Sequence, residues 1–403
     1  MADTTTIPVI SDVGREYLRI HLTADVGPVR LRRLVEHLGS LAAVRDASMA
    51  ALEAVEGVGP ALSERLFESR CGDDADARMS REIERAAELG LRIVCAEDDA
   101  YPAPLRHIPD PPVCLYVRGA LDPADAVAVS IVGTRRCSHY GVEQARRLSG
   151  LLAGAGFTVV SGLARGIDGH AHRGALACGG RTVAVLGNGL PAIYPREHGG
   201  LADEIAACGA IVSELPLDTA PERGHFPARN RIIAGMTLGV IVVEAGERSG
   251  ALITARLANE YNREVFAVPG RVDQPGISAG VNRLIRDGGA KLVTCLEDVL
   301  DELGAVGDIM APTASDASGA ADADGPTGAA GGADGSGGPR VRLTDTERAV
   351  FDALRNGCGD PDAVCAATGR AIAAVTATLT TLQLKGVVRQ LPGNRFEVRT
   401  RGG

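Results

Sequence analysis

The chain has 403 residues, of which 45% are hydrophobic and 23% charged, and a formal net charge of −9. This composition indicates a globular protein of two to four structural units. No early stretch has the pattern of a secretory signal and no apolar run reaches membrane-spanning length, so we expect a soluble, cytoplasmic protein with no membrane partner. Its nine cysteines include no CxxC pair, which predicts reduced thiols rather than a disulfide framework or a zinc site.

The negative charge is unevenly distributed along the chain. Residues 1–124 and 301–339 each sum to −7, whereas residues 125–300 sum to +1 and residues 340–403 to +4. The middle and the C-terminal part are therefore available to bind a polyanion.

The chain is expected to fold as four consecutive parts. They are an N-terminal helical module (1–72), an α/β core (73–303), a flexible Gly/Ala/Asp-rich linker (304–339) and a winged-helix domain (340–403). In the first part, residues 57–59 would form the turn of a helix-hairpin-helix, a motif that can bind a DNA phosphate, although the acidic surroundings favour a packing role. The winged helix is expected from three helical patterns and a hairpin, and its third helix offers few groups for reading base edges.

Short β-rich runs alternate with amphipathic helical patterns from residue 126 onward, which predicts a parallel α/β sheet. The expected strands lie within 126–133, 157–162, 181–187, 209–214, 238–245, 263–270 and 290–293. Their near-continuous apolar character suits strands that are buried on both faces. Almost all of them end in Gly, Ser or an acidic residue, and in a doubly wound sheet the carboxyl ends of the strands form the ligand crevice.

Four loops in this core carry small or cationic residues that suit an anion. The candidates are Gly133 and Arg135 in the first loop, Ser161, Gly162, Arg165 and Gly166 in the second, Arg229, Asn230 and Arg231 in the third, and Ser249 and Thr254 in the fourth. The third loop, "FPARNR", would place two arginines at the start of a helix, where a cation is unfavourable unless an anion binds there. We therefore expect a phosphate in a crevice that these loops share.

A metal site is the less favoured interpretation of the second loop. Asp168, His170 and His172 are the residues that would form it. Positions two residues apart on a helix diverge by about 200°, so we do not expect these side chains to meet at one ion. We expect neither a metal nor a cofactor.

Together these blocks resemble the DNA-processing protein A family, also called Smf. The resemblance rests on "IVGTRRCSHYG", "SGLARGIDGHAHRGAL", "VAVLGNGLPAIYPREH", "FPARNRIIAGM" and "IVVEAGERSGALITARLANEYNREVFAVPG", in order over roughly residues 90–300. It implies an extended Rossmann-like, doubly wound core that binds single-stranded DNA, commonly as a homodimer. It also implies loading of the RecA recombinase onto that strand, past single-strand-binding protein, in natural transformation.

The resemblance also implies which residues contact DNA. Carried over position by position, it assigns to the DNA pocket Arg135, residues 161–162 and 165–166, and residues 229–231; Gly133, Ser249 and Thr254 join them from their loop positions. Strand-binding proteins often stack bases on aromatic rings, and Phe226 and Tyr140 are the nearest aromatic residues. We expect Phe226 in the core, and we expect arginine-based binding that is strongly sensitive to salt.

Two enzyme hypotheses compete with this interpretation. Rossmann-like nucleoside-monophosphate phosphoribohydrolases use a "PGGxGTxxE" turn, whereas "EAGERSGALITA" lacks Pro-Gly-Gly and has Ile253 or Thr254 where the acid would fall. A dinucleotide-dependent oxidoreductase needs GxGxxG after one strand and an acid at the end of the next, where "GTRRCS" and Ser161 stand. We therefore expect no catalytic residue, with the phosphoribohydrolase kept as the alternative.

Overall fold

The computed structural model describes residues 9–23, 26–68, 73–309 and 345–370, together with parts of 372–398. Most of the expected linker, and parts of the third helix and of the hairpin turn of the expected winged helix, lie outside these ranges. The chain divides into two compact units, residues 1–299 and residues 300–403.

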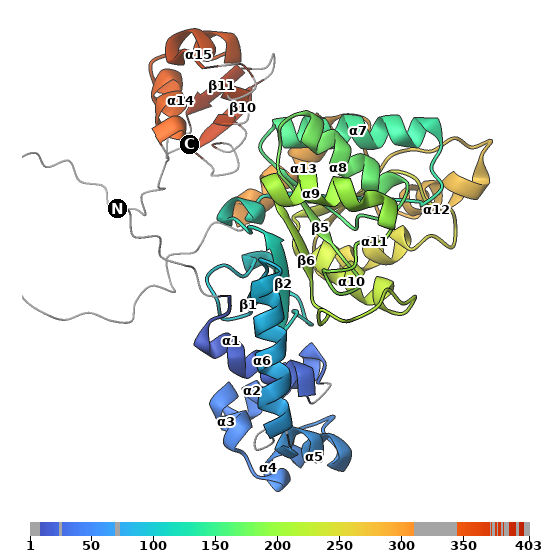
Figure 1. Ribbon diagram of the computed structural model, residues 1–403. Helices are drawn as coiled ribbons and strands as arrows, with labels where there is room; N and C mark the ends of the chain where they lie inside the picture. The colour runs from blue at the N-terminus through green and yellow to red at the C-terminus, as the bar shows by residue number, and fades with distance from the viewer. Residues whose placement is uncertain are drawn as a thin grey trace, which may run out of the picture. The chain divides into compact units, whose positions relative to one another are not determined.

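Six helices precede the sheet. They are α1 (Asp12–Thr23), α2 (Pro28–Leu38), α3 (Leu41–Asp46), α4 (Met49–Glu53), α5 (Pro60–Glu68) and α6 (Asp73–Glu88). Residues 57–59 lie between α4 and α5, and Val58 of this turn and the nearby Val55 are buried in one apolar cluster. The same cluster contains Leu18 of α1 and Met79 of α6, so these helices share a core with the first strands of the sheet (Figure 1).

Nine strands form one sheet in the order β1-β2-β6-β5-β4-β3-β7-β8-β9. Their bounds are β1 (Arg92–Cys95), β2 (Cys114–Gly119), β3 (Ala128–Val132), β4 (Thr158–Ser161), β5 (Thr182–Val185), β6 (Ala210–Ser213), β7 (Gly239–Val242), β8 (Glu264–Ala267) and β9 (Lys291–Leu292). From β6 to β9 every pairing is parallel, which confirms the sheet expected from the sequence. The two antiparallel strands β1 and β2, which extend the sheet beyond β6, were not expected.

Helices cover both faces of the sheet (Figure 1). They are α7 (His139–Gly154), α8 (Ile167–Ala177), α9 (Gly199–Cys208), α10 (His225–Gly235), α11 (Ala251–Glu260) and α12 (Pro275–Arg286). The next helix, α13 (Leu296–Ile309), contains the boundary between the two units. Successive side chains of a strand point to opposite faces. Accordingly, Val183 and Val185 belong to the core cluster of α10 and α11, and Ala184 belongs to the cluster of α9. Within the described ranges, no helix is long and apolar enough to span a membrane.

The strand order reverses at β3. This strand pairs with β4, which follows it in the chain, and with β7 on its other side. At such a point the loops that leave neighbouring strands turn to opposite faces, and a crevice remains at the carboxyl edge of the sheet. The loops after β3 and β7 are those of the first and fourth candidate groups.

The second unit contains α14 (Asp345–Arg355), α15 (Pro361–Thr368) and the antiparallel hairpin of β10 (Val388–Leu391) with β11 (Arg395–Val398). The side chain of Asp360 caps α15 by accepting a hydrogen bond from the N–H of Ala363. Val350, Val364 and Phe396 are buried in one apolar cluster. Helices and hairpin therefore share a small core of their own.

Candidate functional site

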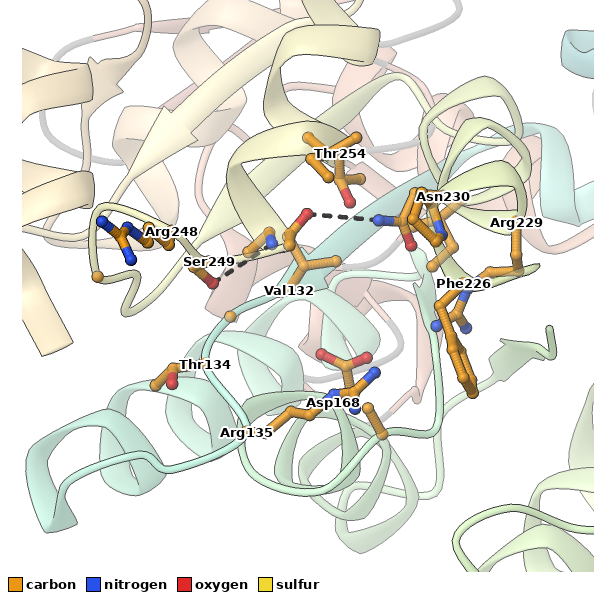
Figure 2. Close-up of a pocket in the computed structure, with 18 of the residues that line it drawn as sticks. Val132, Thr134, Arg135, Asp168, Phe226, Arg229, Asn230, Arg248, Ser249 and Thr254 are labelled. Atoms are coloured by element: carbon orange, nitrogen blue, oxygen red, sulfur yellow. Dashed lines mark hydrogen bonds between the residues drawn. The ribbon is translucent and has the colours of Figure 1, made fainter. Parts of the chain in front are cut away.

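A pocket of about 1320 Å³ opens where the strand order reverses. Its walls come from the loops after β3 and β7, the segment that leads into α10, and the first turns of α10, α11 and α12. The pocket brings together the candidates Gly133, Arg135, Arg229, Asn230, Ser249 and Thr254 (Figure 2). A smaller adjoining hollow is lined by Gly162 and Arg165 together with Arg135.

Three candidates line neither space, namely Ser161, Gly166 and Arg231. The hydroxyl of Ser161 is buried and donates to the carbonyl oxygen of Ile131 at 2.6 Å, which ties β4 to β3. Gly166 has a φ of 76°, and a Cβ there would collide with the backbone of Thr134. These two residues therefore support the loops around the pocket without lining it.

The start of α10 differs from the expectation. The helix begins at His225, so Arg229 and Arg231 lie in its second turn rather than at its N-terminus. Pro227 falls within the first turn, where its missing N–H loses no helical hydrogen bond, and the helix can therefore start earlier. The argument for a bound phosphate from the helix dipole at these arginines is thus wrong.

Arg229 lies at the inner end of the pocket and is only 5% exposed. Its Nη1 donates to the carbonyl oxygens of Gly162, at 2.8 Å, and Val185. Burial lowers the pKa of Arg229 to about 10, although the nearby carboxyl group of Asp168 favours the charged form. Burial likewise raises the pKa of Asp168, against the opposing effect of Arg229. The side chain remains a cation at neutral pH and joins the ends of β4 and β5.

Arg231 points away from the pocket. Its guanidinium pairs with Glu214, and its Nε lies 3.5 Å from a carboxylate oxygen of Asp110. Arg165 also has a carboxylate partner, Glu197, whose pKa falls to about 2 mainly because of that hydrogen bond. The charges of both arginines are thus already balanced within the protein.

An aromatic pair lies beside Arg135. The guanidinium of Arg135 stands 5.2 Å from the ring centroid of Phe226, and the ring centroid of Tyr194 lies 5.8 Å from that of Phe226. All three residues line the pocket. Phe226 was expected in the core; it is instead half-buried with its ring on the pocket wall, because it lies in the exposed first turn of α10.

Two pocket arginines were missed at the level of sequence, Arg223 and Arg248. Both are exposed and line the pocket, and Figure 2 shows Arg248 and Ser249 across the pocket from Phe226 and Arg229. Within the described part of the chain, Arg135, Arg223 and Arg248 form no ion pair. Two features of the sequence could have identified them: Arg248 directly precedes the candidate Ser249, and Arg223 lies three residues before Phe226.

Glu244, just beyond the end of β7, holds the loop that carries Arg135. Its carboxylate accepts hydrogen bonds from the backbone N–H of Ser138, at 2.9 Å, and from the Ser138 hydroxyl. Its carbonyl oxygen accepts from the N–H of Thr134 at 2.7 Å. Gly141 lies against the carboxylate, where a Cβ would collide with it. The loop is therefore fixed on both sides of Arg135.

The start of α11 forms a further wall of the pocket. Asn230 donates from its side-chain amide to the carbonyl oxygen of Gly250 at 3.3 Å, which links α10 to α11. Ser249 precedes the helix and Thr254, only 1% exposed, lies in its first turn (Figure 2). The expected positions of Ser249 and Thr254 around a helix start are confirmed.

Comparison with known proteins gives two family matches. The model of DNA recombination-mediator protein A matches residues 92–304, which is more than half of the chain, and that of the DprA winged helix domain matches residues 337–394. The chain belongs to the DprA/Smf family. This confirms the resemblance found in the sequence, and the second match confirms the winged-helix domain.

Individual DprA/Smf proteins align over much of the chain. Protein Smf of Synechocystis is 38% identical over 387 residues, covering 93% of this chain and 96% of that protein. DNA processing protein DprA of Streptococcus pneumoniae is 44% identical over 237 residues, covering 59% of this chain and 81% of that protein. The X-ray structure of DprA from Streptococcus pneumoniae superimposes with a TM-score of 0.62 at 37% identity, covering 72% of this chain and 97% of that one.

Proposed function

We propose that this protein binds single-stranded DNA in the pocket and acts as a recombination mediator. The observation that carries the proposal is the combination of three arginines that have no ion-pair partner among the described residues, Arg135, Arg223 and Arg248, with the aromatic pair of Phe226 and Tyr194. Arginine binds phosphate through paired N–H donors, and aromatic rings stack on unpaired bases in a sequence-tolerant way. The pocket offers both kinds of contact along one surface.

The size and shape of the pocket favour a strand over a single small molecule. Small-molecule pockets are typically about 300–1,000 Å³, whereas this pocket has about 1320 Å³. Arg223 and Arg248 lie on segments that belong to different walls. A chain of several phosphates can contact both, while the ring of Phe226 on the pocket wall offers a face on which an unpaired base can stack. We therefore expect a preference for single strands.

We further propose that the bound strand passes to the RecA recombinase, past single-strand-binding protein, in the cytoplasm during natural transformation, and that the protein acts as a homodimer. The support is its membership in a family of recombination mediators. The test is RecA filament formation on strands coated with single-strand-binding protein. Faster filament formation with this protein than without it is expected, and an unchanged rate would contradict the loading role.

We propose a non-enzymatic role for the pocket. The phosphoribohydrolase alternative needs a carboxylate that is available for proton transfer. Asp168 lines the pocket, but its carboxyl group accepts backbone hydrogen bonds from Gly162 and Ala164 and faces Arg229. These contacts support a structural role for Asp168. Release of free base from a nucleoside monophosphate by the purified protein would favour the enzyme instead.

The first experiment is fluorescence anisotropy with single-stranded and duplex oligonucleotides of equal length across a salt series. The variants are Arg135→Ala, Arg223→Ala and Arg248→Ala. The matched control is Arg256→Ala, an exposed arginine on α11 that pairs with Glu260 outside the pocket.

Each pocket variant is expected to weaken strand binding at least tenfold, because a charged hydrogen bond contributes about 1.5–3 kcal/mol, or roughly 10- to 150-fold in affinity. Each should also reduce the salt slope by about 0.7, the value for one lost phosphate contact on a single strand. Arg256→Ala should match the wild type. Equal affinity in all four variants, or equal affinity for duplex and single strand, would contradict the proposal.

A further inference from the structure

The segment between β6 and α10, residues 214–224, forms neither helix nor strand, and we call it the arm. Its second half, residues 220–224, is exposed. Pro221 and Arg223 in this half line the pocket, and Phe226 follows directly in the first turn of α10. The arm thus carries Arg223, one of the three pocket arginines that form no ion pair with any residue the structure describes.

The first half of the arm is held by the N-terminal helical module. The N–H of Leu217 donates to a carboxylate oxygen of Glu82 on α6 at 2.8 Å. One residue further along the arm, Asp218 forms an ion pair with Arg85, which lies three residues after Glu82 on α6. From α1, Nε2 of His21 lies 3.0 Å from the carbonyl oxygen of Glu214.

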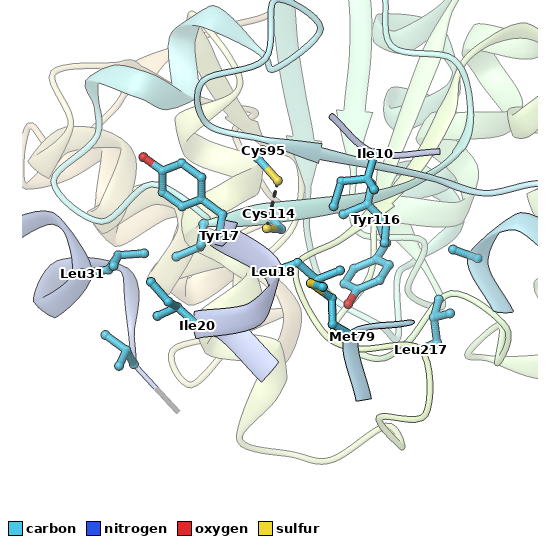
Figure 3. Close-up of a cluster of buried hydrophobic side chains, with 14 of the residues drawn as sticks. Ile10, Tyr17, Leu18, Ile20, Leu31, Met79, Cys95, Cys114, Tyr116 and Leu217 are labelled. Atoms are coloured by element: carbon cyan, nitrogen blue, oxygen red, sulfur yellow. Dashed lines mark hydrogen bonds between the residues drawn. The ribbon is translucent and has the colours of Figure 1, made fainter. Parts of the chain in front are cut away.

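These polar contacts surround a buried apolar anchor. The side chain of Leu217 is 2% exposed and belongs to the same cluster as Leu18 of α1 and Met79 of α6 (Figure 3). The carbonyl oxygen of Leu217 lies so close to Gly189 that a Cβ on that glycine would collide with it. The arm is therefore tightly fixed at Leu217 and exposed only a few residues later.

We propose that Glu82 is a positioning residue for strand binding, which acts through Leu217 to hold Arg223 and Phe226 against the pocket. The proposal rests on the proposed function and assigns the N-terminal helices a part in it. A segment that is already fixed loses little conformational entropy when a ligand binds, whereas a free segment must be ordered by the ligand. Removing the acceptor at Glu82 therefore weakens binding without removing any group that touches DNA.

Two substitutions of Glu82 distinguish the effect of its hydrogen-bond acceptor from that of its negative charge. Glu82→Ala removes the acceptor for the Leu217 N–H, whereas Glu82→Gln retains a carbonyl oxygen in its place. Glu82→Ala is expected to raise the dissociation constant for a single strand about three- to tenfold, the range of one net hydrogen bond, and Glu82→Gln to stay near the wild type. The matched control is Glu84→Ala, an exposed carboxylate on the same helix. Equal affinities for Glu82→Ala and Glu84→Ala would overturn the proposal.

A double-mutant cycle tests whether the effect passes through the arm. If Glu82 acts by placing the arm, Glu82→Ala should cost less affinity once Arg223→Ala is present, since only Phe226 is then left to be placed. Arg248→Ala removes a cation across the pocket. Its loss of binding free energy and that of Glu82→Ala should therefore add in the double variant. Full additivity with Arg223→Ala would overturn the proposal, because general destabilisation affects both cycles alike.

Amide hydrogen exchange provides a readout that needs no DNA. In Glu82→Ala, peptides from residues 214–226 should exchange faster, while β3 and β7 exchange as in the wild type. Unchanged exchange in the arm would overturn the positioning role, even if strand binding is intact. Failure of the wild-type protein to bind a strand, with faster arm exchange in the variant, would instead contradict the proposed function and leave the role of Glu82 in holding the arm supported.

Discussion

The guanidinium of Arg135, in the loop after β3, stands 5.2 Å from the ring centroid of Phe226, in the first turn of α10. Tyr194 extends the aromatic surface from a third segment. A cation beside an aromatic ring is attracted to its face and leaves its outer N–H groups available to an anion. The pair therefore offers a base and a phosphate adjoining places to bind.

Substituting Phe226 tests stacking separately from charge. Phe226→Leu keeps an apolar side chain but loses the aromatic face, so affinity for a single strand should fall roughly 5- to 100-fold, the range of one base–aromatic stack. The salt slope should not change, because no cation is removed. Anisotropy across a salt series measures both quantities. Phe67→Leu, in the N-terminal module, is the control that should bind like the wild type, and a change of slope in Phe226→Leu would argue against stacking.

Arg229 is expected to matter for stability as well as for binding. Arg229→Ala leaves the carbonyl oxygens of Gly162 and Val185 without their donor and Asp168 without its counter-charge. The free energy of unfolding should fall by about 2–4 kcal/mol, as for other broken buried polar contacts. Arg135→Ala, at an exposed site, should change it by less than about 0.5 kcal/mol. Urea unfolding of the two variants measures the difference, and equal stabilities would contradict this role.

Two glycines in α7 form a matched test of the Arg135 loop. A methyl group at Gly141 would meet the carboxylate of Glu244 that holds Ser138, whereas one at Gly154, in the last turn, meets nothing within 4 Å. Gly141→Ala should cost about 1–3 kcal/mol of stability through overpacking and should weaken strand binding. Gly154→Ala should be neutral or stabilise the helix by up to about 1 kcal/mol. Thermal unfolding and anisotropy of both variants check this, and similar behaviour of the two would refute it.

Acid should destabilise the fold partly through His172. Burial, reinforced by the electrostatic effect of the neighbouring His198, lowers the pKa of His172 to about 3. The unfolded chain, with a histidine pKa near 6.5, then binds more protons than the folded chain between about pH 6.5 and pH 3, so stability is lost as pH falls through this window. At pH 5 the loss from this residue should be on the order of 1–2 kcal/mol.

The variant for this test is His172→Gln, which does not titrate and retains a side chain able to bond with the hydroxyl of Thr182. Its stability should fall less steeply between pH 7 and pH 5 than that of the wild type. His139→Gln, at an exposed position, is the control. Urea unfolding across pH gives the slopes, and identical slopes for His172→Gln and wild type would exclude the assignment.

Removing the winged-helix domain tests its contribution to DNA affinity. Residues 340–403 carry a net charge of +4 in a chain of net charge −9, and they belong to a separate compact unit. A tethered basic domain raises the local concentration of cations near a bound strand. Deleting residues 340–403 should therefore lower affinity and flatten the salt slope. Unchanged affinity and slope would show that the domain serves another purpose.

The parallel part of the sheet could be predicted from the sequence because its strands are buried on both faces and are therefore continuous apolar runs. β1 and β2 could not, because residues 96–113, with only a short 3-10 helix at Ala103–His107, separate them and no tight turn signals their pairing. Their pairing depends on contacts between Arg92–Cys95 and Cys114–Val117 that leave no local pattern.

The loops that form the candidate site could be predicted from the sequence, but which of its arginines have carboxylate partners could not. An exposed arginine has the same local sequence character whether or not it has a carboxylate partner. Arg165 meets Glu197 only because the fold brings together residues 32 positions apart. Arg223 and Arg248 have no such partner among the described residues, and only the tertiary structure distinguishes them from Arg165.

The position of β3 in the sheet determines when the pocket can form during synthesis on the ribosome. Val129 of β3 pairs with Val159 of β4, which follows soon after it, and with Gly239 of β7, which the ribosome adds much later. Contacts between distant parts of a chain form late, and a growing chain folds from its N-terminus. Since the pocket lies between the loops after β3 and β7, a nascent chain that has not reached β7 has no place for a DNA strand. The proposed DNA-binding pocket is therefore complete only after the centre of the sheet has closed.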